Sequence, residues 1–203
     1  DAEGRHGAMS VTKSFVGTVA EILIAEGALD DAKLVSHYVP ELSDSAFGSS
    51  TVRQVMDMTA ALDYNENYAD PESDIWQYAA AGDPTPKPDS YTGPRNFYEF
   101  LQGVEQEGVH GEAFIYKSIN TDALAWVIAR ATGKDFIDHL SERIWKPLGM
   151  DQEADMMIDS LGTPFSAGGL SLSLRDAARF GQTLLQNGEL QGEQVIPAAA
   201  VAS

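Results

Sequence analysis

The chain has 203 residues, of which 43% are hydrophobic and 22% charged, enough apolar material for the core of one domain, or of one and a fraction. Its 13 basic and 31 acidic residues give a formal net charge of −18, which argues against nucleic acids and anionic membranes as partners. The absence of cysteine excludes disulfides, thiolate zinc sites and a cysteine nucleophile. Composition therefore predicts a soluble, acidic, globular protein.

The ends of the chain suggest how it relates to a complete protein. The sequence contains no run of eighteen apolar residues, so no membrane span is predicted. It also shows no basic stretch followed by an apolar one, so no signal peptide is predicted, which favours a cytoplasmic location. A well-formed helix is expected only nine residues from the start, and the chain stops in a run of small residues with no concluding element. We therefore expect the domain to be truncated at both ends, and the alternative is that both ends are ordinary surface tails.

Hydrophobic periodicity predicts mostly helices. Apolar residues recur at three- and four-residue steps from Ser10 to Glu26, a pattern typical of an amphipathic helix that ends at Gly27. A short helix is expected around residues 51–59. Residues 60–95 show little periodicity, and a loop of that length is typically a lid, a binding loop or a disordered insert.

Regular structure is expected to return after this segment. The further predicted elements are helices over about 97–104, 120–131 and 135–145, a short extended piece over 113–116, and a strand over 168–172 that enters a helix over 174–186. Because the strands are few and short, the chain is typical of the helical part of a larger fold.

Ser10 and Lys13 form the first candidate reactive pair. On a helix, a spacing of three residues places both side chains on one face, one turn apart. Ser10 would lie at the helix N-terminus, where free N–H groups and the dipole favour developing negative charge. A serine hydroxyl is a weak nucleophile until a neighbour accepts its proton. The pair therefore suits acyl transfer, although a Ser-x-x-Lys spacing alone also fits an ordinary N-cap serine.

Several further segments follow Ser10-Val11-Thr12-Lys13 at plausible spacing. They are residues 63–71, Tyr116 to Trp126, Gly168-Gly169-Leu170-Ser171 and Arg175 to Phe180. The series resembles the serine β-lactamase and penicillin-recognising superfamily, in particular its class C-like esterase and amidase branch. Within that branch, residues 63–71 and 116–126 are most similar to the 6-aminohexanoate-dimer (nylon oligomer) hydrolases. The resemblance covers nearly the whole chain.

The resemblance implies an α+β architecture, the β-lactamase-like (DD-peptidase/transpeptidase) fold. In it a helical domain packs against an antiparallel sheet, with the active site at the junction. Residues 1–203 would form a β-lactamase-like serine hydrolase domain that contains mainly the helical part and lacks part of the sheet. An exposed apolar face would then be covered by a complement that carries the missing sheet, or by a second copy in a homodimer.

The resemblance also implies roles for single residues. Ser10 matches the acylated nucleophile, Lys13 its activating partner, and Tyr116 the tyrosine of the second motif, which shares proton transfer with the lysine. Ser118 stands where class C lactamases have asparagine, a change found in the esterase and nylon-oligomer branch. Ser118 and the loop residue Tyr68 are expected to bind substrate.

Two departures from the family bear on activity. The third motif, Lys-Thr-Gly or a His-x-Gly variant, does not occur in the 203 residues, and its strand usually supplies the second oxyanion-hole N–H. Losing one such donor costs about a hundredfold or more in rate. Efficient dimer hydrolases also hold the substrate's ammonium with a loop carboxylate, at a place that aligns with Ala79 here, near Asp74 and Asp83. The loop carries aromatic residues that either line the substrate pocket or pin the loop to the body: Tyr64, Trp76, Tyr78 and Tyr91.

Three functions fit these residues. The first is a serine hydrolase that cleaves esters or linear amides through an acyl-serine intermediate, with a small-molecule ester or amide as its partner. The second is a penicillin-recognising, sensor-like module that acylates without turnover. The third is an inactive fragment without the third motif. Histidines and acidic runs lack the spacing of metal ligands, so no metal or cofactor is expected.

Overall fold

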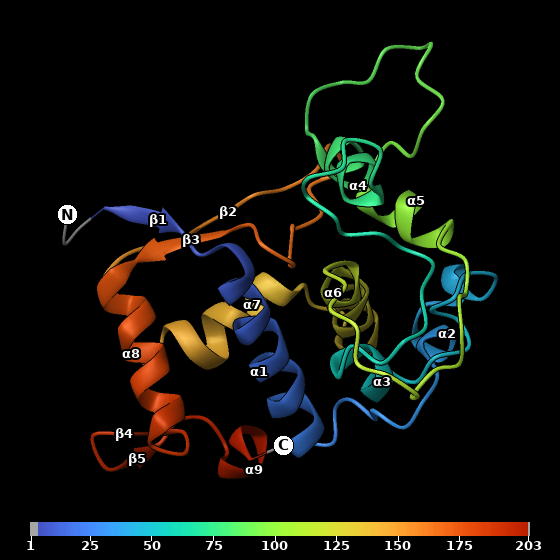
Figure 1. Ribbon diagram of the computed structural model, residues 1–203. Coiled ribbons are helices and arrows are strands. Elements are labelled where there is room, and N and C mark those ends of the chain that lie inside the picture. The colour runs from blue at the N-terminus through green and yellow to red at the C-terminus, as the bar shows by residue number, and fades with distance from the viewer. Residues whose placement is uncertain (1–3, 203) are drawn as a thin grey trace.

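The computed structural model describes residues 4–202 (Figure 1). The α-helices are α1 (Thr12–Ala25), α2 (Val35–Tyr38), α3 (Val52–Met56), α4 (Asp74–Gly82), α5 (Phe97–Gln102), α6 (Ile119–Thr132), α7 (Phe136–Leu140), α8 (Leu174–Leu185) and α9 (Ala198–Val201). Two 3-10 turns, η1 (Met9–Val11) and η2 (Pro40–Leu42), precede α1 and follow α2, and a π-helical turn, η3 (Ser141–Trp145), continues α7.

Small antiparallel sheets accompany the helices. The strands are β1 (Arg5–Gly7), β2 (Asp155–Met156), β3 (Leu170–Ser173), β4 (Glu189–Leu190) and β5 (Glu193–Gln194). The first sheet has the order β1-β3-β2 and sets His6 opposite Leu172, whereas β4 and β5 pair with each other. This mixture of helices and antiparallel strands agrees with the predicted α+β class.

Helix α1 is the centre of the packing. Its buried apolar residues recur at helical spacing, as the sequence predicts: Phe15, Val16, Val19, Ile22 and Leu23. Figure 1 shows α1 between α8 and α6, and α1 also packs against α7 and α9. The Phe15 ring stacks on Phe180 of α8, with centroids 3.9 Å apart. Burying one such side chain stabilises the fold by roughly 1.5–3 kcal/mol.

Both backbone polar groups of Leu170 hold the start of α1 against β3. The N–H of Leu170 donates to Thr12 Oγ1 at 3.2 Å, and the Leu170 carbonyl accepts from the N–H of Ala8 at 2.7 Å. Met9 has a φ of +49°, a left-handed conformation that is uncommon outside glycine. The chain therefore turns sharply from β1 into α1, and Ser10 lies in that turn.

The glycine pair before β3, Gly168-Gly169, permits close packing. A Cβ on Gly169 would lie 2.8 Å from the carbonyl oxygen of Phe165, a distance that real side chains do not tolerate. The Gly169 N–H donates to the same carbonyl at 2.7 Å and closes the turn. This turn sets the position of Ala167, which contacts the candidate site.

The structure differs from the predicted elements in several places. No concluding element was predicted in the run of small residues near the end, but helix α9 (Ala198–Val201) forms there and packs against α1. Residues 60–95 contain α4, whose buried positions Ile75, Tyr78 and Ala81 share one face. Residues 113–116 lie in no strand, and Ile115 instead donates its N–H to the Met58 carbonyl at 3.0 Å. The helix predicted over 135–145 changes from α to π geometry at Ser141.

The segment between α4 and α5 projects from the rest of the fold, and it carries Tyr91 (Figure 1). Among residues 4–202, no helix combines the length and the apolar character that crossing a bilayer requires. The candidate site lies away from the tip of this projection, at the start of α1.

Candidate active site

The three predicted catalytic residues meet beside the N-terminal end of α1. Lys13 Nζ donates to Ser10 Oγ at 3.1 Å, and the Tyr116 hydroxyl donates to the same oxygen at 2.7 Å. Ser10 lies in η1, just before α1 begins at Thr12, so the expected one-turn spacing is kept although the first turn is 3-10. Because Tyr116 is 106 residues from Ser10, tertiary structure alone brings them together.

The surroundings of Tyr116 alter its acidity. Burial raises the pKa of the phenol, but hydrogen bonding with Lys13 and Ser10 and the positive charge of Lys13 outweigh burial and lower it below the usual value. The Tyr116 side chain is 42% exposed, so a substrate can reach it. A phenol of lowered pKa, open to solvent and bonded to a serine, is suited to proton transfer.

A backbone carbonyl holds Lys13 in place. Its Nζ donates to the carbonyl oxygen of Ala167 at 2.7 Å, in addition to its bond with Ser10. Ala167 precedes the glycine pair and is 2% exposed. The amino group of Lys13 is therefore fixed between the nucleophile and a buried part of the backbone.

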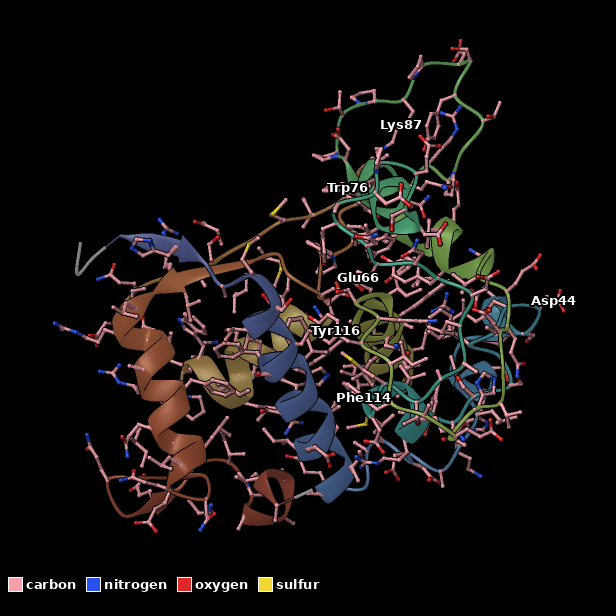
Figure 2. All side chains as sticks on the ribbon, in the orientation of Figure 1. Asp44, Glu66, Trp76, Lys87, Phe114 and Tyr116 are labelled. Atoms are coloured by element: carbon pink, nitrogen blue, oxygen red, sulfur yellow. The ribbon has the colours of Figure 1, made fainter. Side chains whose placement is uncertain are left out.

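Glu66 connects the two predicted substrate-binding residues. Its Oε1 accepts from the hydroxyls of Ser118 at 2.7 Å and Tyr68 at 2.5 Å, and its Oε2 accepts from the Ser118 N–H at 2.6 Å. Figure 2 shows Glu66 and Tyr116 in the central part of the molecule. Burial and the bond to Glu66 raise the pKa of Tyr68 to about 12, so its hydroxyl stays protonated at neutral pH.

Sequence reasoning did not single out Glu66. It lies within the segment that resembles the nylon-oligomer enzymes, two residues before Tyr68, but as one of 31 acidic residues it gives no local signal. Its contact with Ser118 spans 52 positions, which no spacing rule predicts. The role of Glu66 follows from the tertiary structure alone.

The aromatic residues of the loop divide into two groups. Tyr64 and Tyr78 are 5% and 1% exposed and both meet Phe100 edge-on, which pins the segment to the body. Trp76 is 43% exposed and packs edge-on against Tyr68, with ring centroids 6.1 Å apart. The Tyr68–Trp76 pair is therefore the part of the loop that is available to a ligand.

The acidic residues near Ala79 are occupied by local hydrogen bonds. Asp74 Oδ2 accepts from the N–H of Asn65 at 2.8 Å, and Asp83 Oδ1 accepts from the N–H of Thr85 at 2.8 Å. Ala79 itself lies on the exposed face of α4. Each carboxylate is thus bonded to the backbone of its own segment.

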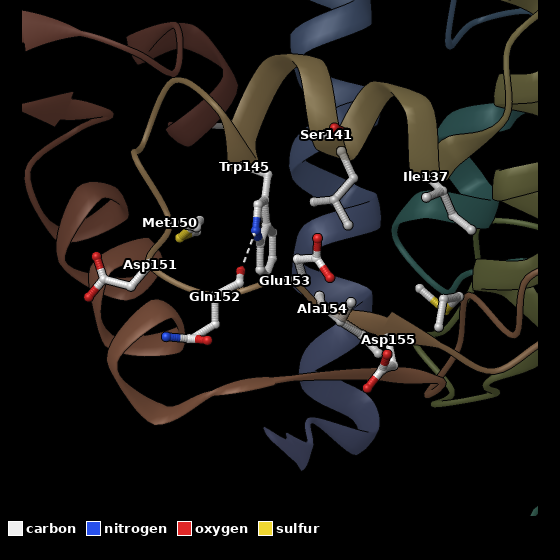
Figure 3. A pocket seen from close by; sticks show the side chains of 12 residues that line it. Ile137, Ser141, Trp145, Met150, Asp151, Gln152, Glu153, Ala154 and Asp155 are labelled. Atoms are coloured by element: carbon white, nitrogen blue, oxygen red, sulfur yellow. Dashed lines mark hydrogen bonds between the residues drawn. The ribbon is translucent and has the colours of Figure 1, made fainter. Parts of the chain in front are cut away.

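A cavity of about 450 Å³ lies elsewhere, between α7, η3 and β2 (Figure 3). Its lining is largely apolar and includes Ile137, Leu140, Trp145, Met150, Met156 and Leu170. The Trp145 indole N–H donates to the Gln152 carbonyl at 2.9 Å across one side. Ser10, Lys13 and Tyr116 are not among its lining residues, so this cavity is separate from the candidate active site.

Comparison with known families decides the assignment of the fold. The family described as Beta-lactamase matches residues 1–202. This chain belongs to the Beta-lactamase family. The 6-aminohexanoate-dimer hydrolase of Paenarthrobacter ureafaciens is 40% identical over 202 residues, which make up 96% of this chain and 49% of that enzyme. The chain therefore spans about half the length of this Beta-lactamase-family relative.

Solved structures support the same assignment. A Bacillus anthracis protein, provisionally assigned as a 6-aminohexanoate-dimer hydrolase, has a TM-score of 0.91 and 34% identity, and the match covers 100% of this chain and 53% of that one. A D-stereospecific amidohydrolase from Streptomyces sp. has a TM-score of 0.71 at 20% identity, with 100% and 65% coverage, and shows the fold alone. The predicted resemblance and the predicted fold class are thus both confirmed.

Proposed function

We propose that this Beta-lactamase-family chain carries the catalytic serine of a hydrolase that cleaves esters or linear amides through an acyl-serine intermediate. The observation that carries the proposal is the convergence of Lys13 Nζ and the Tyr116 hydroxyl on Ser10 Oγ. The name of the Paenarthrobacter relative, a hydrolase of an amide dimer, supports the substrate class. We also propose that residues 1–203 belong to one serine hydrolase domain.

Acylation begins with attack of Ser10 Oγ on the carbonyl carbon of the substrate. The serine proton passes to the Lys13–Tyr116 pair, whose two polar atoms lie within hydrogen-bond distance of Oγ. The C–O or C–N bond of the substrate then breaks, and Tyr116 returns a proton to the leaving alcohol or amine. The N-terminal end of α1 favours the negative charge that develops on the carbonyl oxygen.

Deacylation uses the same groups, with water in the place of the leaving alcohol or amine. A water molecule attacks the acyl-serine ester, gives its proton to the Lys13–Tyr116 pair and releases the carboxylic acid, while Ser10 Oγ regains a proton. The net reaction consumes one water for each ester or amide bond. In the family, the third motif supplies the second oxyanion-hole donor, and it is not among the 203 residues.

The loop residues favour a simple ester over an amino-terminated amide. The exposed Tyr68–Trp76 pair offers an apolar wall, and Glu66 holds the Tyr68 and Ser118 hydroxyls together. The family resemblance places Ala79 near the position where the dimer hydrolases have a carboxylate, and Asp74 Oδ2 accepts from the backbone N–H of Asn65. The side chain of Ala79 itself therefore offers no charge to an ammonium-bearing substrate.

Intact-mass spectrometry with a fluorophosphonate tests the proposal, because the probe reports an activated serine without requiring turnover. We expect a single adduct that is absent in Ser10→Ala and retained in Ser14→Ala, which alters an exposed serine of α1. No adduct on the folded protein would refute an activated Ser10. Steady release of p-nitrophenol from p-nitrophenyl esters supports the hydrolase, whereas one equivalent of product supports the sensor-like module.

A further inference from the structure

Asp122 is a buried carboxylate that the proposed reaction does not use. It lies in the first turn of α6 and is 3% exposed. Its Oδ1 accepts from the N–H of Ala167 at 3.1 Å, whereas its Oδ2 is buried without a hydrogen-bond partner among residues 4–202. Burying a carboxylate in this way is costly, so its position calls for a physical explanation.

The backbone of Ala167 connects this carboxylate to the reactive pair. The Ala167 N–H faces Asp122, and its carbonyl accepts from Lys13 Nζ at 2.7 Å. The same Nζ lies 3.1 Å from Ser10 Oγ. A continuous hydrogen-bonded path therefore runs from α6 through one buried residue to the nucleophile.

We propose that Asp122 is a positioning residue, which holds the Ala167 backbone in the orientation that fixes the amino group of Lys13 beside Ser10. This inference rests on the proposed function, because that function gives Lys13 its role. Two planar peptide units meet at Ala167, and Asp122 holds the first of them. The second is held by the N–H of Gly168, which donates to the Phe165 carbonyl at 3.3 Å. With both units held, the Ala167 carbonyl has little freedom to turn away.

The groups that face Asp122 come from four parts of the chain. They are Lys13 from α1, Tyr64 from the segment before α4, Tyr78 from α4 and Tyr98 from α5. Burial raises the pKa of Asp122 to about 7, although the Tyr78 hydroxyl, backbone N–H groups and the charge of Lys13 oppose the rise. Burial also raises the pKa of the three phenols, so Tyr64, Tyr78 and Tyr98 stay neutral near pH 7.

Two substitutions of similar shape test whether Asp122 acts through the oxygen that accepts from Ala167 or only by filling space. Asp122→Asn keeps an oxygen that accepts from Ala167, whereas Asp122→Leu removes it. We expect the rate of fluorophosphonate labelling of Ser10 to fall by about tenfold to a hundredfold in Asp122→Leu, because small misplacement of a reacting group can cost that much. Asp122→Asn should label within a few-fold of the wild type. Circular dichroism establishes that each variant is folded.

Asp176 provides the matched control. It is fully buried and its Oδ1 accepts from the N–H of Asp151 at 2.7 Å, but it does not contact Lys13 or Ala167. Asp176→Asn and Asp176→Leu should change thermal stability without changing the labelling rate of the folded protein. Slower labelling of Asp176→Leu, by the same factor as Asp122→Leu, would assign the effect to general loosening and overturn the inference.

The amide resonance of Ala167 gives a second readout that needs no substrate and no labelling. In a ¹⁵N–¹H spectrum we expect this resonance to lie close to its wild-type position in Asp122→Asn, which keeps an accepting oxygen, and to move in Asp122→Leu, which removes the acceptor of the Ala167 N–H. An Ala167 resonance at the same position in Asp122→Leu as in the wild type overturns the inference.

The labelling outcomes distinguish the two proposals. No labelling of the wild type overturns the proposed function, and this inference with it. If the wild type and Asp122→Leu are labelled at the same rate, the inference about Asp122 is overturned and the proposed function stands. Equal slowing in Asp122→Asn and Asp122→Leu also overturns it, because the accepting oxygen would then be irrelevant.

Discussion

The two sides of the candidate site are held by different kinds of contact. At the start of α1, each contact has a backbone group of residues 167–170 as one partner: Leu170 donates to Thr12 Oγ1 and accepts from the Ala8 N–H, and Ala167 accepts from Lys13. The loop side is joined to the site by side chains, through the carboxylate of Glu66. A backbone partner persists through most substitutions of its own residue, whereas the carboxylate of Glu66 is lost with a single substitution. We therefore expect the α1 side to fix the chemistry and the loop side to tune the substrate.

The largest effect is expected on the α1 side, from Lys13→Met. This change removes the amino group that bonds Ser10 Oγ and keeps a side chain of similar length. We expect kcat/KM for p-nitrophenyl esters to fall by about 10³-fold or more, as happens when one member of a catalytic unit is removed. Lys33→Met, which alters an exposed lysine outside the site, should leave the rate unchanged. Equal rates for the two variants would contradict the role of Lys13.

Tyr116→Phe should have a smaller effect on the same side. It removes the hydroxyl that donates to Ser10 and returns a proton to the leaving group, and losing a general acid costs about 10²-fold or more. The pKa of Tyr116 is lowered, so its protonated form is lost as pH rises through a value below 10, the usual pKa of tyrosine. The pH profile of kcat should show an alkaline limb that Tyr116→Phe lacks. An unchanged limb would assign it to another group.

The reactive pair could be predicted from sequence because its geometry is local. A spacing of three residues on one helix determines that Ser10 and Lys13 are neighbours, whatever the rest of the fold. Tyr116 was predicted only through the family resemblance, since 106 residues separate it from Ser10. Ala167 acts through its backbone carbonyl, and a carbonyl is common to every residue type. No pattern of side chains predicts such a contact.

The loop side was harder to predict for a different reason. Helix α4 was missed because three successive small residues, Ala79-Ala80-Ala81, blur the contrast between its buried and exposed faces. Glu66 has no distinctive neighbours in sequence, and its partner Ser118 lies on the far side of α5 in the chain. Segments whose contacts are made mostly by side chains over long separations leave little periodic signal.

Glu66→Gln tests the loop side of the comparison. Glutamine keeps one acceptor oxygen but cannot accept from both Ser118 and Tyr68 with the strength of a carboxylate. Hydrogen bonds to a charged group contribute about 1.5–3 kcal/mol, so KM should rise by about tenfold while kcat changes less. Glu72→Gln, an exposed residue of the same segment, serves as the control. A loss confined to kcat would show instead that Glu66 acts on the chemical step.

The smallest effect is expected from Trp76→Ala, which removes half of the exposed aromatic pair. Such pairs contribute about 0.5–1.5 kcal/mol, and Trp76 is already 43% exposed, so stability should change little. KM should rise a few-fold for esters of long apolar acids and stay the same for acetate esters, because only a long acyl chain reaches the wall. Gln77→Ala, on the same exposed face of α4, should affect neither substrate. An equal rise for both esters would mean that the loop orders the whole site rather than selecting the acyl chain, and the division between a chemical side and a substrate side would then fail.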